Sequence, residues 1–318
     1  MTKTGSLAKV SDIPKPNRKK EILRDLRMNY AVYLMVLPVI IHFLIFQYRP
    51  MVGILMAFQD FSVARGLWGS RWVGFEHFIR FFDSIFFYRV IRNTLVINIL
   101  RLVIFFPLPI IFALCLNEIR NQLFKRTVQT ISYLPFFIST VVIISILRDF
   151  VTSDGIITQI AVFFGDPGGA LIARPEWFRP LFIGQHIWSQ LGFASIIYIS
   201  ALSSIDQELY EAAKIDGAGR MKQTWYITLP GLIPTITVLL ILQIGQLMNV
   251  GFETILLMYS PAVFETADVI STFVFRTGIQ ENNFSFSTAV NLFNSVINFI
   301  LIFIANMLSR KYGETSLW

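Results

Sequence analysis

The sequence predicts an all-α integral membrane protein with six transmembrane helices. Hydrophobic residues make up 54% of the 318-residue chain and charged residues only 15%, whereas soluble domains carry about 25% charged residues. Six long segments contain no Asp, Glu, Lys or Arg. Most of them approach or exceed the roughly 20 residues that a helix needs to cross about 30 Å of hydrocarbon. Composition and the charge-free segments therefore indicate helices that span a lipid bilayer.

The six segments differ in how clearly each predicts a span. In chain order they are Met28–Tyr48, Leu102–Leu116, Thr130–Leu147, Leu181–Ile205, Gln223–Phe252 and Asn282–Ser309. The second segment is too short by itself. It reaches spanning length only if its helix begins near Asn93 and includes Arg101, and Pro107 and Pro109 then interrupt its regularity.

Lys and Arg gather on one side of the expected bilayer. The amino-terminal tail 1–27 holds eight of them, Asn117–Gln129 and Tyr210–Pro230 hold three each, and the carboxyl terminus holds two. The alternate loops Arg49–Phe87, Val151–Pro180 and Ser260–Glu281 carry four, two and one. The positive-inside rule then predicts that both termini are cytoplasmic. The tail lacks the short charged region and cleavage site of a signal peptide, so we expect it to be retained.

The expected organisation is a cytoplasmic basic tail at residues 1–28, a transmembrane domain at 29–310 and a cytoplasmic tail at 311–318. Residues that support catalysis or metal binding are scarce. Cys115 is the single cysteine, and His42, His77 and His186 lie far apart without ligand neighbours at helical spacing. No G-x-x-x-x-G-K-[ST] loop is present. We predict a protein that is not an enzyme, that holds no metal or cofactor, and whose net charge of +7 reflects topology rather than nucleic-acid binding.

A polar segment separates the fourth and fifth apolar segments. One of Ser203, Ser204 and Asp206 can cap a short helix that begins near Ile205, and the pair Asp216-Gly217 signals its end. A second short helix is expected over Met221–Thr228, with Pro230 introducing the next span. Two alanines beside a glycine turn let another backbone approach closely. The hairpin at 204–230 is therefore either a docking surface or a tight connection.

The hairpin carries the residues of a known motif. Glu211-Ala212-Ala213, Gly217, Ile227 and Leu229-Pro230 stand at the spacings of the "EAA" loop of ABC importer permeases. With Asp216 and Ala218 around the glycine, the loop resembles that of carbohydrate importers. The stretches PMVGILMAFQDF, WVGFEHFIRFF, RTVQTISYLPFF, WFRPL, NVGFETILLMYSP and the terminal SLW are similar to oligosaccharide and polysaccharide permeases of the LplB and YteP type.

This resemblance implies a mechanism and a set of partners. The expected fold is that of a type I ABC importer permease in a bacterial inner membrane. The chain would receive an oligosaccharide, in some relatives an acidic one, from an extracytoplasmic solute-binding protein. It would pair with a second six-span permease and with an ATPase dimer that binds ATP and Mg. The resemblance assigns ATPase coupling to Glu211, Ala212, Ala213, Asp216, Gly217, Ile227, Leu229 and Pro230, with Glu211 meeting a basic residue of the ATPase.

Polar residues recur at helical spacing inside two of the apolar segments. Gln243, Gln246, Asn249 and Glu253 predict one stripe on the fifth span, and Asn291, Asn294 and Asn298 predict another on the sixth. Gln185 and Trp188 on the fourth span are further candidates. Polar groups at membrane depth are expected to face the bundle or a wet cavity. Amides that pair with sugar hydroxyls suggest a substrate path, and the alternative is hydrogen bonding between helices.

Two other functions compete with the importer. An ion-coupled secondary transporter of six spans needs acidic residues at mid-membrane, and Glu253 is the single span carboxylate that the sequence places there. Arg101 could pair with Glu253, extend to the surface or attract an acidic substrate. A membrane enzyme needs a catalytic constellation, which the sequence does not offer.

Overall fold

The computed structural model describes residues 25–312. Internal contacts divide the chain into two compact units, Met1–Leu55 and Met56–Trp318. Nearly all of the expected basic tail at 1–28 and most of the tail at 311–318 lie outside the described residues. Those two domain boundaries therefore stay predictions.

The first unit carries the first apolar segment as a helix. α2 (Tyr30–Phe43) continues into a π-helical turn, η1 (Leu44–Tyr48), and into α3 (Arg49–Met51). The 3-10 stretch η2 (Val52–Phe58) follows, and Tyr30–Phe58 as a whole is long and apolar enough to cross a membrane. A helix that is apolar on every side is typical of a membrane span.

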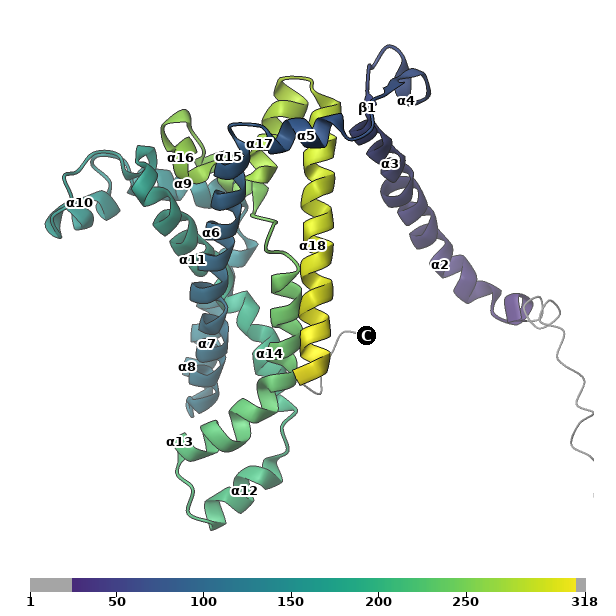
Figure 1. Cartoon of the computed structure of the whole chain (residues 1–318). Helices are drawn as coiled ribbons and strands as arrows, with labels where there is room; N and C mark the ends of the chain where they lie inside the picture. Colours follow the sequence, from purple (N-terminus) through teal and green to yellow (C-terminus); the bar gives the residue numbers. More distant parts are fainter. Residues whose placement is uncertain (1–24, 313–318) are drawn as a thin grey trace, which may run out of the picture. The chain divides into compact units, whose positions relative to one another are not determined.

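The second unit is a helical bundle (Figure 1). Its long helices are α6 (Phe87–Phe105) with α7 (Pro107–Glu118), α11 (Pro175–Ser203), α14 (Leu229–Ile244) and α18 (Phe284–Tyr312). The hairpin of α12 (Gln207–Ile215) and α13 (Arg220–Gln223) extends from one end of this bundle. The opposite end is covered by α5 (Glu76–Phe82), α15 (Phe252–Met258), α16 (Phe264–Ala267) and α17 (Ile270–Phe275).

Shorter elements complete the described part of this unit. They are β1 (Gln59–Asp60), paired antiparallel with β2 (Arg71–Trp72), and α4 (Gly66–Gly69), α8 (Gln122–Tyr133), η3 (Leu134–Phe137), α9 (Thr140–Phe150), α10 (Ile156–Phe163), η4 (Leu171–Ala173), η5 (Thr224–Thr228), η6 (Pro261–Val263) and η7 (Arg276–Gln280). A cluster of buried aromatic rings joins α5, α17 and α18, with Phe81, Phe273 and Phe286 mutually in contact. This cluster anchors the end of the bundle that carries α15, α16 and α17.

Four helices and two bent helix pairs account for the six predicted spans. The four are Tyr30–Phe58, Phe87–Glu118, Arg220–Ile244 and Phe284–Lys311. The third segment was expected as one helix, but α8 with η3 meets α9 at 100°. Pro135 lies in η3, Ile138 is extended, and Ser139 caps α9 by accepting from the Val142 N–H at 3.4 Å. A proline followed by a new cap ends one helix and begins the next. The fourth segment is continuous in α11 to Ser203, and the chain bends by 68° only beyond it, where α12 of the hairpin begins.

The second and fifth segments also differ from expectation. The second span begins at Phe87 rather than near Asn93. Its prolines do not break it, because Pro107 stands at the start of α7 and Phe106 keeps helical dihedral angles, φ −54° and ψ −42°. In the fifth span no separate second short helix forms: α13, η5 and α14 run together as Arg220–Ile244. The π-helical turn η5 shifts the hydrogen bonding just before Pro230, whose nitrogen cannot donate.

Candidate functional site

The hairpin at 204–230 folds as the local sequence predicts at its first helix. Of the three candidate caps, Asp206 accepts from the Glu208 N–H at 3.0 Å and starts α12. The helix ends at Ile215 with Asp216 as its C-cap, and Gly217 has a φ of +75°, a region that glycine enters without steric cost. The Ala218 N–H then bonds back to the Ala213 carbonyl at 2.8 Å. The turn is therefore closed by its own backbone.

The motif residues of this hairpin are mostly exposed. Glu211, Ala212, Asp216, Gly217 and Pro230 are exposed, and Ala213, Ile227 and Leu229 are partly buried. The two arms are joined by a 3.0 Å hydrogen bond between the Tyr210 hydroxyl and Thr228 Oγ1.

Large apolar side chains also point outward from the hairpin. Ile215, Met221, Trp225 and Tyr226 are 87%, 72%, 61% and 80% exposed. Apolar side chains that gather beside charged ones on a projecting segment mark an interaction surface. The hairpin therefore exposes apolar as well as charged side chains.

The predicted polar stripe on the fifth span does not lie on one helix. α14 ends at Ile244, and a connector at 245–251 separates it from α15. Gln243 is on α14, Gln246 and Asn249 are in the connector, and Glu253 is in the first turn of α15. The continuous helix expected through Phe252 is therefore wrong. Gly245 and Gly251 bracket the connector, and these glycines were the available signal for a break.

Side chains from α6 and α18 hold the connector by its backbone. Asn98 donates to the Leu247 carbonyl at 2.7 Å, and Asn298 Oδ1 accepts from the Met248 N–H at 3.0 Å. Arg101 donates to the Asn249 carbonyl at 3.5 Å. Non-helical backbone within a membrane protein must find its hydrogen bonds inside the protein, because lipid offers none. We refer to the connector, together with Asn98, Arg101 and Asn298 that bind it, as the connector clamp.

Three residues of the expected substrate path form hydrogen bonds within the protein in or beside the clamp. Asn298 bonds the connector backbone, and the amides of Asn294 and Asn249 meet at 3.5 Å. These residues use their polarity to join helices, which is the alternative that the sequence left open. Asn291 is exposed on α18. Asn98 was missed by the sequence analysis because it lies on the second span, outside both predicted stripes.

A cavity of about 130 Å³ lies beside the clamp. It is lined by the α6–α7 span, α11, α14 and the connector, through Asn98, Arg101, Leu102, Phe105, Phe106, Pro109, Ala194, Ile197, Tyr198, Leu239, Gln243 and Leu247. Of the predicted path residues, Gln243 lines this cavity. Gln185 and Trp188 line a different, largely apolar cavity of about 280 Å³ between α9 and α11. The predicted path residues therefore do not converge on one place in the described chain.

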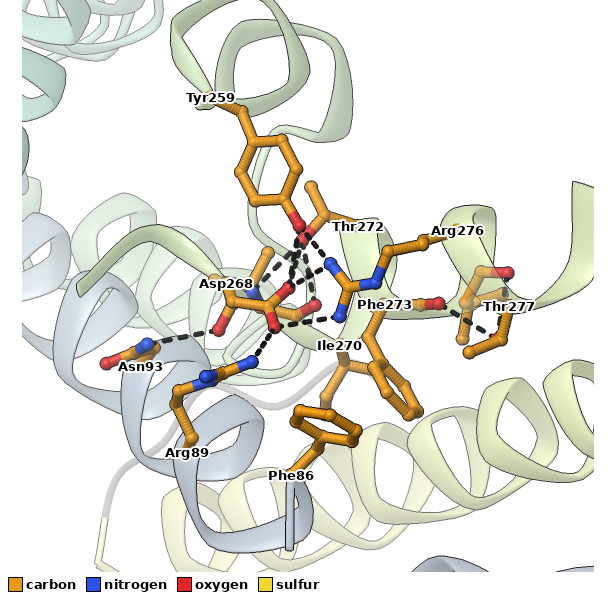
Figure 2. Close-up of polar contacts among 12 residues, drawn as sticks. Phe86, Arg89, Asn93, Tyr259, Asp268, Ile270, Thr272, Phe273, Arg276 and Thr277 are labelled. Atoms are coloured by element: carbon orange, nitrogen blue, oxygen red, sulfur yellow. Dashed lines mark hydrogen bonds and ion pairs between the residues drawn. The ribbon is translucent and has the colours of Figure 1, made fainter. Parts of the chain in front are cut away.

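A buried carboxylate at the other end of the bundle organises a network that the sequence analysis missed (Figure 2). Asp268 is fully buried and accepts from Arg89 at 2.8 Å and from both terminal nitrogens of Arg276 at 3.0 and 3.1 Å. Tyr259 and Thr272 donate to it at 3.0 and 3.3 Å.

The network continues into α6 and α11. Asn93 donates to the backbone carbonyls of Glu265 and Asp268 at 2.9 and 3.1 Å, and Arg179 donates to Asn93 Oδ1 at 3.0 Å. Burial, with the nearby Asp268 carboxylate, raises the pKa of Tyr259 above its usual range, so its hydroxyl stays a donor. The network thus links α6, α11 and the α16–α17 segment through side-chain hydrogen bonds.

The loop after α10 is held by two ion pairs that share Arg174. Arg174 contacts Asp166 at 2.5 Å and Glu176 at 2.7 Å. The hydrogen bond from Arg174, followed by the Gly168 N–H, lowers the pKa of Asp166 below its ordinary value of 3.8. Within residues 25–312, no three or more His, Cys, Asp or Glu residues gather as a metal ion would need.

The fold and the hairpin define a class of protein. The chain matches the family described as binding-protein-dependent transport system inner membrane component over residues 105–314, well over half of its length. It belongs to this family, and it is an inner-membrane transport component. The matched region includes the hairpin, the connector at 245–251 and Asp268, whereas Asn98 and Arg101 of the clamp and Arg89 and Asn93 of the network precede it.

Particular relatives agree with this assignment over nearly the whole chain. The polygalacturonan/rhamnogalacturonan transport system permease protein YteP of Bacillus subtilis is 45% identical over 96% of this chain and 95% of its own length. Protein LplB of the same bacterium is 43% identical over 92% of each chain. A crystal structure of a bacterial ABC transporter that imports the acidic polysaccharide alginate matches with a TM-score of 0.84 and 41% identity, over 92% of this chain and 99% of that chain. The type I ABC importer permease fold predicted from the sequence is thereby confirmed.

Proposed function

We propose that this chain is the transmembrane permease subunit of an ATP-driven importer of oligosaccharides derived from acidic polysaccharides. The observation that carries the proposal is the 41% identity and 0.84 TM-score to the alginate importer, over almost the whole length of both chains. YteP, which is named for transport of polygalacturonan and rhamnogalacturonan, supports the same substrate class. Family membership favours this importer over an ion-coupled secondary transporter.

The permease works in this proposal as one part of an assembly. A second six-span permease completes the path, because six helices alone do not enclose a passage wide enough for an oligosaccharide. An extracytoplasmic solute-binding protein delivers the sugar. A related structure contains a periplasmic protein bound to an alginate pentasaccharide, which supports this partner. A separate ATPase dimer binds ATP and Mg²⁺ and hydrolyses ATP, so the permease itself is not an enzyme.

The hairpin couples the permease to the ATPase. Its projecting position, the exposed apolar side chains and the exposed Glu211 support a docking role. Glu211→Lys should weaken retention of the ATPase during purification and abolish substrate-stimulated ATP hydrolysis, because like charges repel across a docking surface. Glu281→Lys, the same reversal just before α18 and away from the hairpin, should retain the ATPase. Equal retention in both variants would contradict the coupling role.

The orientation of the chain follows from its basic loops. In a Cys115→Ala background, Pro167→Cys in the outer loop should react with an impermeant thiol reagent in intact cells. Lys214→Cys in the hairpin should react only after the membrane is permeabilised. The opposite labelling pattern would reverse the assignment of the hairpin to the cytoplasm.

Uptake by the reconstituted assembly tests the whole proposal. Proteoliposomes that contain both permeases and the ATPase, supplied with the binding protein and a uronate oligosaccharide, should accumulate sugar only with ATP. Accumulation driven by an ion gradient without ATP would favour a secondary transporter instead. A chain that hydrolyses ATP when purified alone would refute the division of labour.

A further inference from the structure

Arg101 is a cation near the middle of an apolar helix. It lies 14 residues from one end of the span Phe87–Glu118 and 17 residues from the other. At 1.5 Å per residue these are about 21 Å and 26 Å along the helix axis. A charged side chain at such a depth is costly for insertion, and it usually marks a substrate or ion pathway.

Within residues 25–312, no carboxylate pairs with Arg101. Glu253, the partner considered from the sequence, makes no ion pair with it. The hydrogen bond that Arg101 donates, to the Asn249 carbonyl, is long at 3.5 Å. A single long bond to a neutral carbonyl leaves most of the five guanidinium donors unused. The charge of Arg101 is therefore not compensated by the described part of the chain.

The cavity beside the connector clamp surrounds this cation with groups that suit a sugar. Gln243 lines the cavity, and its amide has no hydrogen-bond partner in the described part of the chain. Tyr198, Phe105 and Phe106 supply aromatic rings in the same lining. Amides pair with hydroxyls, aromatic rings offer apolar faces, and a guanidinium binds a carboxylate through two parallel hydrogen bonds.

The size of the cavity limits what it can take. Its volume of about 130 Å³ lies below the roughly 300–1,000 Å³ of pockets that enclose a whole drug-sized ligand. That space admits a carboxylate with part of one sugar ring and excludes a whole oligosaccharide. The cavity is thus a subsite for one acidic group, while the rest of the sugar lies outside it.

We propose that Arg101 binds the carboxylate of a uronate unit in this cavity and thereby makes the permease prefer acidic over neutral oligosaccharides. The proposal rests on the proposed function and names the residue that determines specificity within it. Gln243 serves as the neighbouring hydroxyl-binding group. Binding of an anion beside Arg101 would also neutralise a charge that is otherwise unpaired at membrane depth.

Direct binding to the assembled importer tests this assignment. The probes are radiolabelled tetramers of galacturonate and of mannuronate, each compared with the same tetramer after reduction of its carboxyl groups to alcohols. Binding to the complex of both permeases and the ATPase in nanodiscs, without binding protein, isolates the permease from the specificity of the binding protein. The variants are Arg101→Gln, Arg101→Lys and, as a matched control, Arg92→Gln, which removes an exposed cation from the same helix outside the cavity.

The expected results separate the assignment from its alternatives. Arg101→Gln should weaken binding of an acidic tetramer by about ten-fold or more, with the neutral tetramer unchanged. Arg101→Lys should keep most of the acidic preference, and Arg92→Gln should keep all of it. If Arg101→Gln weakens both tetramers equally, or neither, Arg101 serves only to hold the connector and the assignment is wrong. A wild-type complex that transports neutral oligosaccharides and ignores acidic ones would instead contradict the substrate class of the proposed function.

Discussion

Replacing Asp268 with asparagine tests whether the buried network holds together the end of the bundle opposite the hairpin. The carboxylate is fully buried and accepts hydrogen bonds at 2.8–3.3 Å from Arg89, Arg276, Tyr259 and Thr272. Asparagine keeps the volume but turns an NH₂ group toward guanidinium donors, and it leaves two cations without their counter-charge. Removing one partner from a buried ion pair costs about 3–5 kcal/mol.

The structure favours the lower part of that range. The side chains of Arg89 and Arg276 are 32% and 19% exposed, so water can solvate part of the uncompensated charge. A loss of about 3 kcal/mol corresponds to a fall of about 6–12 °C in the unfolding midpoint for a domain of this size. The midpoint can be measured from the fraction of detergent-solubilised permease that survives heating, as resolved by size-exclusion chromatography.

A matched control separates the effect of burial from the effect of losing a negative charge. Asp60→Asn makes the same substitution in a carboxylate that is 64% exposed and lies 3.8 Å from Arg65, where an ion pair contributes at most about 1 kcal/mol. The double variant Asp268→Asn/Arg276→Gln should lose less stability than the sum of the two single variants, because both remove the same interaction. If Asp268→Asn lowers the midpoint no more than Asp60→Asn, or if the two effects simply add, the network does not stabilise the bundle as argued.

Three further predictions concern the connector, the hairpin and the loop after α10. Asn98→Ala leaves the Leu247 carbonyl without its donor and should cost about 1–3 kcal/mol, whereas Asn291→Ala, at an exposed amide on α18, should change the unfolding midpoint little. Gly217→Pro cannot adopt the φ of +75° and should abolish transport while membrane insertion stays normal; Gly219→Ala, in the same hairpin at φ −67°, should transport normally. The folded-state pKa of Asp166 is lowered, so its ion pair supports the loop after α10 above about pH 4 and weakens as the pH falls through that lowered pKa. Limited proteolysis should therefore cut this loop faster in acid than at neutral pH, and Asp166→Asn should remove the difference.

Local features of the chain were predictable because their causes are local. The apolar segments, the presence of a cap among Ser203, Ser204 and Asp206, and the turn at Gly217 each depend on a few neighbouring residues. Their identities set the hydrophobic length, the capping hydrogen bond and the accessible φ. The resemblance carried by the EAA loop added the family and the fold, which the comparisons confirm. The roles of the loop residues and of the expected substrate path stay predictions.

The effects of the prolines were only partly predictable from the sequence. Pro135 ends a helix, whereas Pro107 and Pro230 are accommodated within continuous apolar helices. The difference depends on whether the surrounding turns can shift their hydrogen bonding, as the π-helical turn before Pro230 does. A sequence pattern shows the proline but not the response of the turn that precedes it.

The sequence by itself determined which segments enter the membrane, where the hairpin turns and which family the chain resembles. Only the tertiary structure decided that the fifth span breaks at 245–251, that Asn98 and Asn298 hold the break, and that Asp268 pairs with Arg89. These partners are separated by 149, 50 and 179 positions along the chain. Hydropathy and helical periodicity report on neighbours within a few turns. A polar side chain in a span can satisfy its hydrogen bonds on any adjacent helix, so its partner is settled only when the helices pack.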